Sequence, residues 1–175
     1  MNKSTPLLLS SLFALGLGLS ATAHAAGPND AQIAAIVVAA NSVDIDAGKQ
    51  AETKTHNKDV RAFAERMVAD HSGVNQQATA LVQKLHVTPE DNDTSKSLTS
   101  GGAATRTRLA GLSGKAFDKA YVDNEVTYHQ TVLDALDKTL IPNASNAELK
   151  ALLVKVRPAF VAHLEHAKHI QAELK

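Results

Sequence analysis

The chain has 175 residues, and its 18 Lys and Arg balance 18 Asp and Glu, so its formal net charge at pH 7 is zero. A balanced charge with only 3% aromatic residues argues against nucleic-acid binding, which needs a basic surface. The chain has no cysteine, which excludes disulfides and thiolate metal sites, so its stability must come from packing.

The first 25 residues have the pattern of a cleaved signal peptide. Lys3 gives a short positive segment, residues 7–19 are apolar, and Ala23-His24-Ala25 ends in an A-x-A cleavage pattern. The apolar segment is short for a membrane helix, and no later stretch approaches the roughly 18 apolar residues that such a helix needs. We therefore expect cleavage after Ala25, export to the periplasm of a Gram-negative cell, and no transmembrane segment in the mature chain.

The mature chain, residues 26–175, is the length of one domain. Apolar residues at helical spacing predict four long helices, over about residues 30–54, 58–85, 116–140 and 145–174. Asp30 and Ser145 are expected to cap the first and last of these. Pro142 is expected to end the third helix, and Pro158 to kink the fourth or disturb one of its turns.

Residues 88–115 differ from the helical segments in composition, since they are rich in Thr, Ser, Gly and Asp. We expect a long connection there, with room for a short helix over about residues 103–112. No sustained alternation of apolar and polar residues predicts a strand. Two antiparallel helix pairs joined by a long crossover between helices 2 and 3 predict an all-α, ferritin-like four-helix bundle.

Each predicted helix carries one residue of metal-ligand type on its apolar stripe, namely Asp44, His71, His129 and His163. Burying an ionisable group costs several kcal/mol unless it is hydrogen-bonded, paired or bound to a metal. Counting residues from the turns places Asp44, His71 and His129 at about the same height along the helix axes. The same count places His163 roughly 9 Å along the axis from His129, level with Glu125, which lies one turn before His129 on the same stripe.

One carboxylate with two or three imidazoles suits Zn, Fe, Cu or Mn. We therefore predict a transition-metal site formed by Asp44, His71, Glu125, His129 and His163, where Glu125 and His163 complete the site or form a second layer. The alternative is that these residues are hydrogen-bonded members of the core. Among their neighbours, Asp70 is either an orienting partner or a solvated carboxylate, His166 is an auxiliary at most, His169 is a surface residue, and Tyr121 and Tyr128 are packing residues with wet hydroxyls.

Four segments carry a resemblance to a known family. The segments VDIDAGKQA, FAERMVADHSGVN, FDKAYVDNEVTYH and RPAFVAHLEHAKHI resemble, in order and spacing, the bacterial ferritin-like family known as domain of unknown function 4142. The resemblance covers essentially the whole mature chain. It implies a secreted four-helix bundle without an established activity, with the acid at 44 and the histidines at 71, 129 and 163 at family-like positions. The chain lacks the Glu-x-x-His motif of di-iron carboxylate proteins, so ferroxidase chemistry is not carried over.

No nucleophile elbow, P-loop or dinucleotide fingerprint occurs, so conventional enzyme chemistry is not indicated. Two functions are compatible with the sequence. The first is an exported bundle that binds a transition metal and acts in metal handling or envelope stress. The second is a non-catalytic structural or interaction protein of the cell envelope, whose polar core residues set the helix register. A metal-dependent oxidase is a third and weaker alternative.

Overall fold

The computed structural model describes residues 27–174, so the predicted signal peptide, residues 1–25, lies outside the described residues. Within residues 27–174 the chain is all-helical, as predicted, and contains no strand. The elements are α1 (Asp30–Lys54), α2 (Lys58–Lys84), α3 (Asp93–Ala110), α4 (Gly114–Ala135), the π-helical turn η1 (Leu136–Leu140), α5 (Ile141–Asn143) and α6 (Ala147–Glu173).

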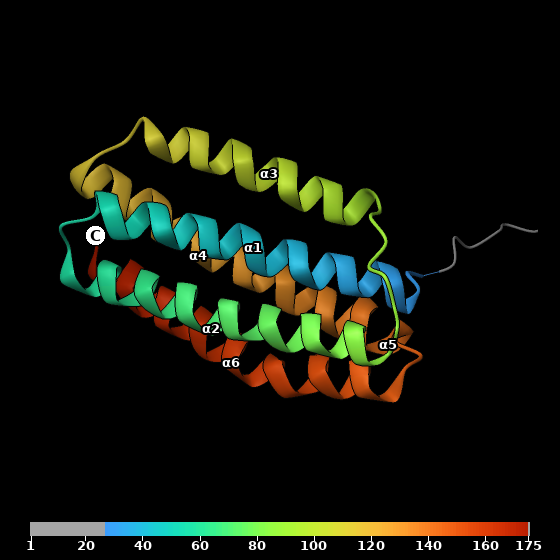
Figure 1. The fold of residues 1–175 in the computed structure, drawn as a ribbon. Helices are drawn as coiled ribbons and strands as arrows, with labels where there is room; N and C mark the ends of the chain where they lie inside the picture. The colour runs from blue at the N-terminus through green and yellow to red at the C-terminus, as the bar shows by residue number, and fades with distance from the viewer. Residues whose placement is uncertain (1–26, 175) are drawn as a thin grey trace, which may run out of the picture.

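Four long helices, α1, α2, α4 and α6, lie side by side, and α3 lies outside them against α1 (Figure 1). Their buried apolar residues form two clusters, one toward each end of the helices. On α1, for example, Ile33, Ile36 and Val37 belong to one cluster and Ala47 and Ala51 to the other, and Asp44 lies between them. His71 and His129 occupy the same intermediate place on α2 and α4. The core therefore consists of two apolar regions separated by a buried polar layer.

The helices begin at asparagines, which corrects two predicted caps. The side chains of Asn29 and Asn146, not those of Asp30 and Ser145, accept hydrogen bonds from backbone N–H groups at the starts of α1 and α6. An Asn cap satisfies N–H groups that have no partner inside the helix. The Asp30 carboxylate instead accepts from the backbone N–H groups of Ser145 and Asn146, each at 2.9 Å. Asp30 thereby ties the start of α1 to the start of α6.

The segment predicted as a long connection contains an 18-residue helix, α3. Its N-cap, Asn92, forms a capping box with Ser95, a signal that outweighs the low helix propensity of the following residues. Gly102 lies so close to α1 that a Cβ added to it would lie 2.7 Å from both methyl carbons of Val43. The glycine that suggested a loop thus permits close approach of two helices.

The connection between α4 and α6 also differs from the prediction. The chain does not leave the helical path at Pro142; it continues through η1 and α5 to Asn143. In a regular α-helix, the ring of Pro142 would crowd the carbonyl four residues earlier, and its nitrogen could donate no hydrogen bond. The π-helical turn immediately before it widens the backbone there. The turn into α6 consequently falls at residues 144–146, and α6 continues through Pro158.

Among the described helices, α1 is the one whose length and mean hydropathy, 1.2 over its most apolar 18 residues, would allow it to cross a membrane. Half of that window is buried within the protein. A helix at the centre of a helical core passes the same test, and α1 packs against α2, α3 and α4. We therefore describe α1 as a core helix.

Gly48 and Gly73 provide a matched test of the packing between α1 and α2. A Cβ at Gly48 would lie 2.9 Å from Val68 Cγ2 and 3.1 Å from the Ala64 carbonyl oxygen, whereas one at Gly73 has no neighbour within 4 Å. Gly48→Val is expected to destabilise the protein by about 1 to 3 kcal/mol through overpacking. Gly73→Val should change stability by less than about 1 kcal/mol. Urea unfolding of both variants checks the difference, and equal effects would contradict close packing at Gly48.

Candidate metal centre

The polar layer brings together the five residues predicted from the sequence. Asp44, His71, Glu125, His129 and His163 come from all four long helices, and each is at most 3% exposed. The three imidazole rings form a nearly equilateral triangle, with centroid separations of 5.6, 5.3 and 5.4 Å. His163 thus lies beside His71 and His129 and not in a separate layer. The later turn into α6 removes most of the axial offset that Pro142 had suggested.

Hydrogen bonds fix the tautomers of His71 and His129. Asn41 Nδ2 donates to the Val37 carbonyl at 2.9 Å, so Asn41 Oδ1 faces His71 and can only accept. His71 Nδ1, 2.7 Å from that oxygen, is therefore a donor. His129 Nδ1 lies 3.0 Å from the Glu125 carbonyl oxygen, which also accepts only. In the neutral rings, both Nε2 atoms then carry free lone pairs, and both are buried without a hydrogen-bond partner.

His163 follows the same pattern with its two ring nitrogens exchanged. His163 Nε2 donates to Asp70 Oδ2 at 2.8 Å, and Asp70 also accepts from Arg66. His163 Nδ1 is left buried and without a partner. The Asp70 side chain is 42% exposed, so it both orients a buried imidazole and contacts solvent. Each of the three histidines thus donates through one nitrogen to a fixed acceptor, an arrangement typical of metal ligands.

The Asp44 carboxylate faces two of these imidazoles. Asp44 Oδ2 lies 2.7 Å from His71 Nε2 and 3.4 Å from His129 Nε2, yet neither contact has the geometry of a hydrogen bond. Neither oxygen of Asp44 has a donor with hydrogen-bond geometry, although the carboxyl group of Glu125, when protonated, is close enough to donate to it. If His71 is neutral, its Nε2 and Asp44 Oδ2 are two acceptors in contact, and they repel each other. A proton or a cation between them removes that repulsion.

Burial and charge shift the protonation of the two carboxyl groups in opposite directions. Burial raises the pKa of Asp44, but interactions with His71 and His129 outweigh it and hold this pKa at about 2. Burial and the nearby Asp44 charge raise the pKa of Glu125 well above its ordinary value. Glu125 Oε2 lies 3.6 Å from His129 Nδ1 and has no hydrogen-bond partner. Asp44 is thus the permanent negative charge of the centre, and Glu125 holds its proton more tightly.

Two of the three histidines, His129 and His163, resist protonation. Burial lowers the pKa of His163 to about 4, and the neighbouring His71 and His129 add to this effect against the opposing bond to Asp70. Burial also lowers the pKa of His129 against the attraction of Asp44. At neutral pH both rings are therefore neutral and offer lone pairs, as metal binding requires.

The donor atoms are close enough to share one ion. One atom from each of His71, His129 and His163 lies within 4.8 Å of the others, and the same holds for Asp44, Glu125 and His129. Two ligands about 2.1 Å from one ion lie roughly 3 to 3.4 Å apart at octahedral or tetrahedral angles, so small side-chain shifts suffice. His129 belongs to both groups but has one free ring nitrogen. The arrangement therefore fits a single ion.

Neighbouring aromatic residues enclose the centre. The ring of Phe160 stacks on His71 at 5.0 Å and lies 6.0 Å from His163, so it shields one side from water. The hydroxyl of Tyr121, predicted to be wet, is buried without a partner. The Tyr128 hydroxyl donates to the Ala40 carbonyl at 2.8 Å. The Tyr121 hydroxyl is therefore part of the interior, whereas the partly buried Tyr128 is held by its hydrogen bond to the backbone of α1.

The remaining histidines of α6 do not join the centre. His166 packs edge-on against Phe63, with ring centroids 5.3 Å apart. The side chain of His169 is 72% exposed and pairs with Glu173, as predicted for a surface residue. Sequence reasoning missed Asn41 and Phe160. The signal for Asn41 was present, because an amide three residues before Asp44 falls on the same face of the helix.

Replacing Asn41 tests the orientation of His71. Asn41→Ala removes the acceptor that holds His71 Nδ1, so the ring loses its fixed tautomer. We expect metal affinity to fall by about 10- to 100-fold. Competition titration against a chromophoric chelator measures this change. Asn75→Ala is the matched control at the same helix pair, since Asn75 bonds only Ser42 in this structure. Equal affinity of the Asn41 variant and the wild type would exclude this role.

The fold and the centre define an all-helical protein with a buried cluster of three histidines and two carboxyl groups. The chain belongs to the family described as domain of unknown function (DUF4142), whose family model matches residues 18–170. No curated protein and no solved structure matches the chain significantly.

Proposed function

We propose that this chain is an exported, ferritin-like four-helix protein that binds one divalent transition-metal ion in its core and acts in metal handling or envelope stress. The ligands are Asp44, His71, His129 and His163, and Glu125 is an additional carboxylate. One observation carries the proposal: three buried imidazoles each donate through one nitrogen and leave the other without a partner, and one nitrogen of each ring lies within 4.8 Å of the other two.

The energetic argument concerns the unpartnered acceptors. A buried donor or acceptor without a partner costs about 1 to 3 kcal/mol. The free nitrogens of His71, His129 and His163 and both oxygens of Asp44 all fall into this class. One cation satisfies these acceptors together and balances the Asp44 charge. Imidazole and carboxylate ligands suit Zn, Fe, Cu or Mn, and the signal-like first 25 residues support export.

The 2.7 Å contact between Asp44 and His71 supports a second candidate function. A proton held between these side chains would make them a buried imidazolium–carboxylate pair and satisfy two acceptors without a metal. The protein would then be a non-catalytic structural or interaction protein of the envelope, whose hydrogen-bonded core specifies the helix register.

Elemental analysis separates the two candidates. Untagged protein, exported and purified from its native compartment without chelators, should contain about one transition-metal ion per chain under the first proposal. Metal-free protein should show a higher melting temperature with at least one of Zn²⁺, Fe²⁺, Cu²⁺ and Mn²⁺, since a ligand that binds only the folded state stabilises it. If the native protein contains no metal and none of the four ions alters the melt, the metal proposal fails and the proton-bridged core stands.

A further inference from the structure

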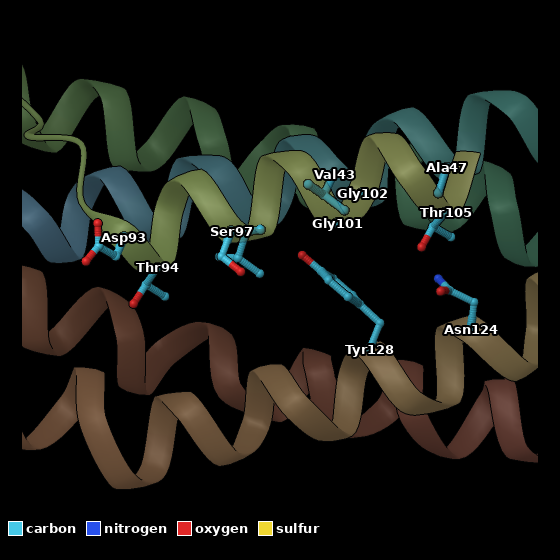
Figure 2. Close-up of a pocket in the computed structure, with 11 residues that line it drawn as sticks. Val43, Ala47, Asp93, Thr94, Ser97, Gly101, Gly102, Thr105, Asn124 and Tyr128 are labelled. Atoms are coloured by element: carbon cyan, nitrogen blue, oxygen red, sulfur yellow. The ribbon is translucent and has the colours of Figure 1, made fainter. Parts of the chain in front are cut away.

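A groove of about 510 Å³ lies between α3 and α4, on the outside of the polar layer (Figure 2). Its walls carry oxygen-bearing side chains, among them Thr94, Ser97, Thr105, Asn124 and Tyr128. Asp93 is the charged residue of the lining, and no Lys or Arg belongs to it. The groove therefore offers oxygen ligands and no repulsive charge to a hydrated cation.

The side chain of Asn124 links the groove to the metal centre. Asn124 faces the groove from α4 (Figure 2), and its Nδ2 lies 3.4 Å from Glu125 Oε1, to which it donates. The other oxygen of Glu125, Oε2, lies on the inner side, 3.6 Å from His129 Nδ1. Glu125 thus spans the wall, with one carboxylate oxygen toward the groove and one toward the imidazoles.

The two adjacent glycines of α3 differ in their surroundings. Gly102 needs its small size to pack on Val43, but a Cβ at Gly101 would have no neighbour within 4 Å. Gly101 lines the groove opposite Tyr128 (Figure 2). A glycine inside a helix costs about 1 kcal/mol relative to alanine. Close packing does not explain why a glycine occupies position 101. The absence of a side chain there leaves the groove open.

The construction of α3 also favours opening at this place. α3 buries only Ser95, Gly102 and Leu109. It packs mainly along α1, where Gln50 and Lys54 donate to the carbonyls of Arg106 and Ala110. A helix with so few buried residues has a low free energy of local opening. Movement of α3 away from α4 would widen the groove and leave the four long helices in place.

We propose that this groove is the route by which a hydrated divalent cation reaches the centre, with Asn124 as the gate and Glu125 as the first carboxylate it meets. This inference rests on the proposed metal-binding function. A second cavity, of about 30 Å³, reaches His71 and His129 from the apolar end of the core, but its lining is mainly apolar, with residues such as Leu136 and Phe160, and it does not serve a hydrated ion. On the α2–α6 side, the fully buried ring of His163 is held in place by its hydrogen bond to Asp70.

The absence of cysteine makes the test selective, since a single introduced thiol can be labelled alone. In mature Gly101→Cys protein, freed of metal with a chelator, the thiol is coupled to a bulky methanethiosulfonate reagent. Stopped-flow absorbance then follows the binding of Co²⁺. We expect the label to slow association by about 10-fold or more and to leave the equilibrium Kd unchanged, because it obstructs the route and not the ligands. Reduction of the mixed disulfide should restore the rate.

Gly73→Cys with the same label is the matched control, since Gly73 is also a helical glycine with open space but lies on α2, away from the groove. Its association rate should equal that of the wild type. If the label leaves the association rate of Gly101→Cys protein unchanged, or slows both labelled variants equally, the proposed route is wrong and the proposed metal-binding function is unaffected. If unlabelled wild-type protein binds no Co²⁺, Zn²⁺, Fe²⁺, Cu²⁺ or Mn²⁺, the proposed function and the route both fail.

Discussion

Metal-dependent stabilisation is expected to disappear when His71 and His129 are both replaced by alanine. At a free metal concentration of about 100 times Kd, a single site stabilises the wild type by about 2.7 kcal/mol. For a domain of this size, that corresponds to a rise in melting temperature of roughly 5 to 10 °C. The double variant loses two buried imidazole ligands and should show no rise. Differential scanning fluorimetry, with and without the ion found in the native protein, measures both shifts.

His169→Ala controls for the loss of a histidine as such, because this exposed residue lies on α6 but outside the centre. It should keep the full metal-dependent shift. The double substitution also changes the stability of the metal-free protein. Each shift in melting temperature is therefore measured relative to the same protein without metal. A shift of wild-type size in the double variant would show that the ion binds elsewhere.

Acid should destabilise the metal-free protein through His163. The pKa of this imidazole is about 4 in the folded protein, because burial opposes its charge, and about 6.5 in the unfolded chain. The unfolded chain therefore takes up the proton first. Stability is fully present above about pH 6.5 and is lost as the pH falls toward 4, by at most about 3 kcal/mol. Urea unfolding in the presence of a chelator, between pH 7 and pH 4, measures this loss.

His163→Gln isolates this contribution, because other groups titrate in the same range. The lowered pKa of His129 acts in the same direction, and the raised pKa of Glu125 acts in the opposite one. The free energy of unfolding of the wild type, relative to the variant, should fall as the pH decreases. A constant difference over this range would mean that His163 takes up its proton equally well in the folded state.

Helical periodicity predicted much of this fold, because apolar stripes depend on local spacing. The bounds of α1 agree with the prediction, and those of α2 differ by one residue. The signals that failed depend on tertiary structure. Glycine and serine suggested a loop over α3, where Gly102 instead allows contact with α1. Pro142 suggested a break, where a π-helical turn accommodates the ring.

The candidate site was predictable in composition but not in arrangement. The stripe positions selected Asp44, His71, His129 and His163, and all four lie in the polar layer. Their relative levels depended on where the turn into α6 falls, which the residue count placed too early. Of the partners that fix the ring orientations, Asp70 was one of two alternatives and Asn41 was missed, because both act through contacts between helices that residue spacing does not describe.

The distribution of the donors over α1, α2, α4 and α6 has a consequence for biosynthesis. No two of the four principal ligands are neighbours in sequence, so the unfolded chain has no preformed site and the ion can bind only once the helices have assembled. If a chain exported as we propose folds only after it has crossed the membrane, cytoplasmic metal pools play no part in the choice of ion. The occupant is then selected by the supply of ions in the compartment where folding is completed.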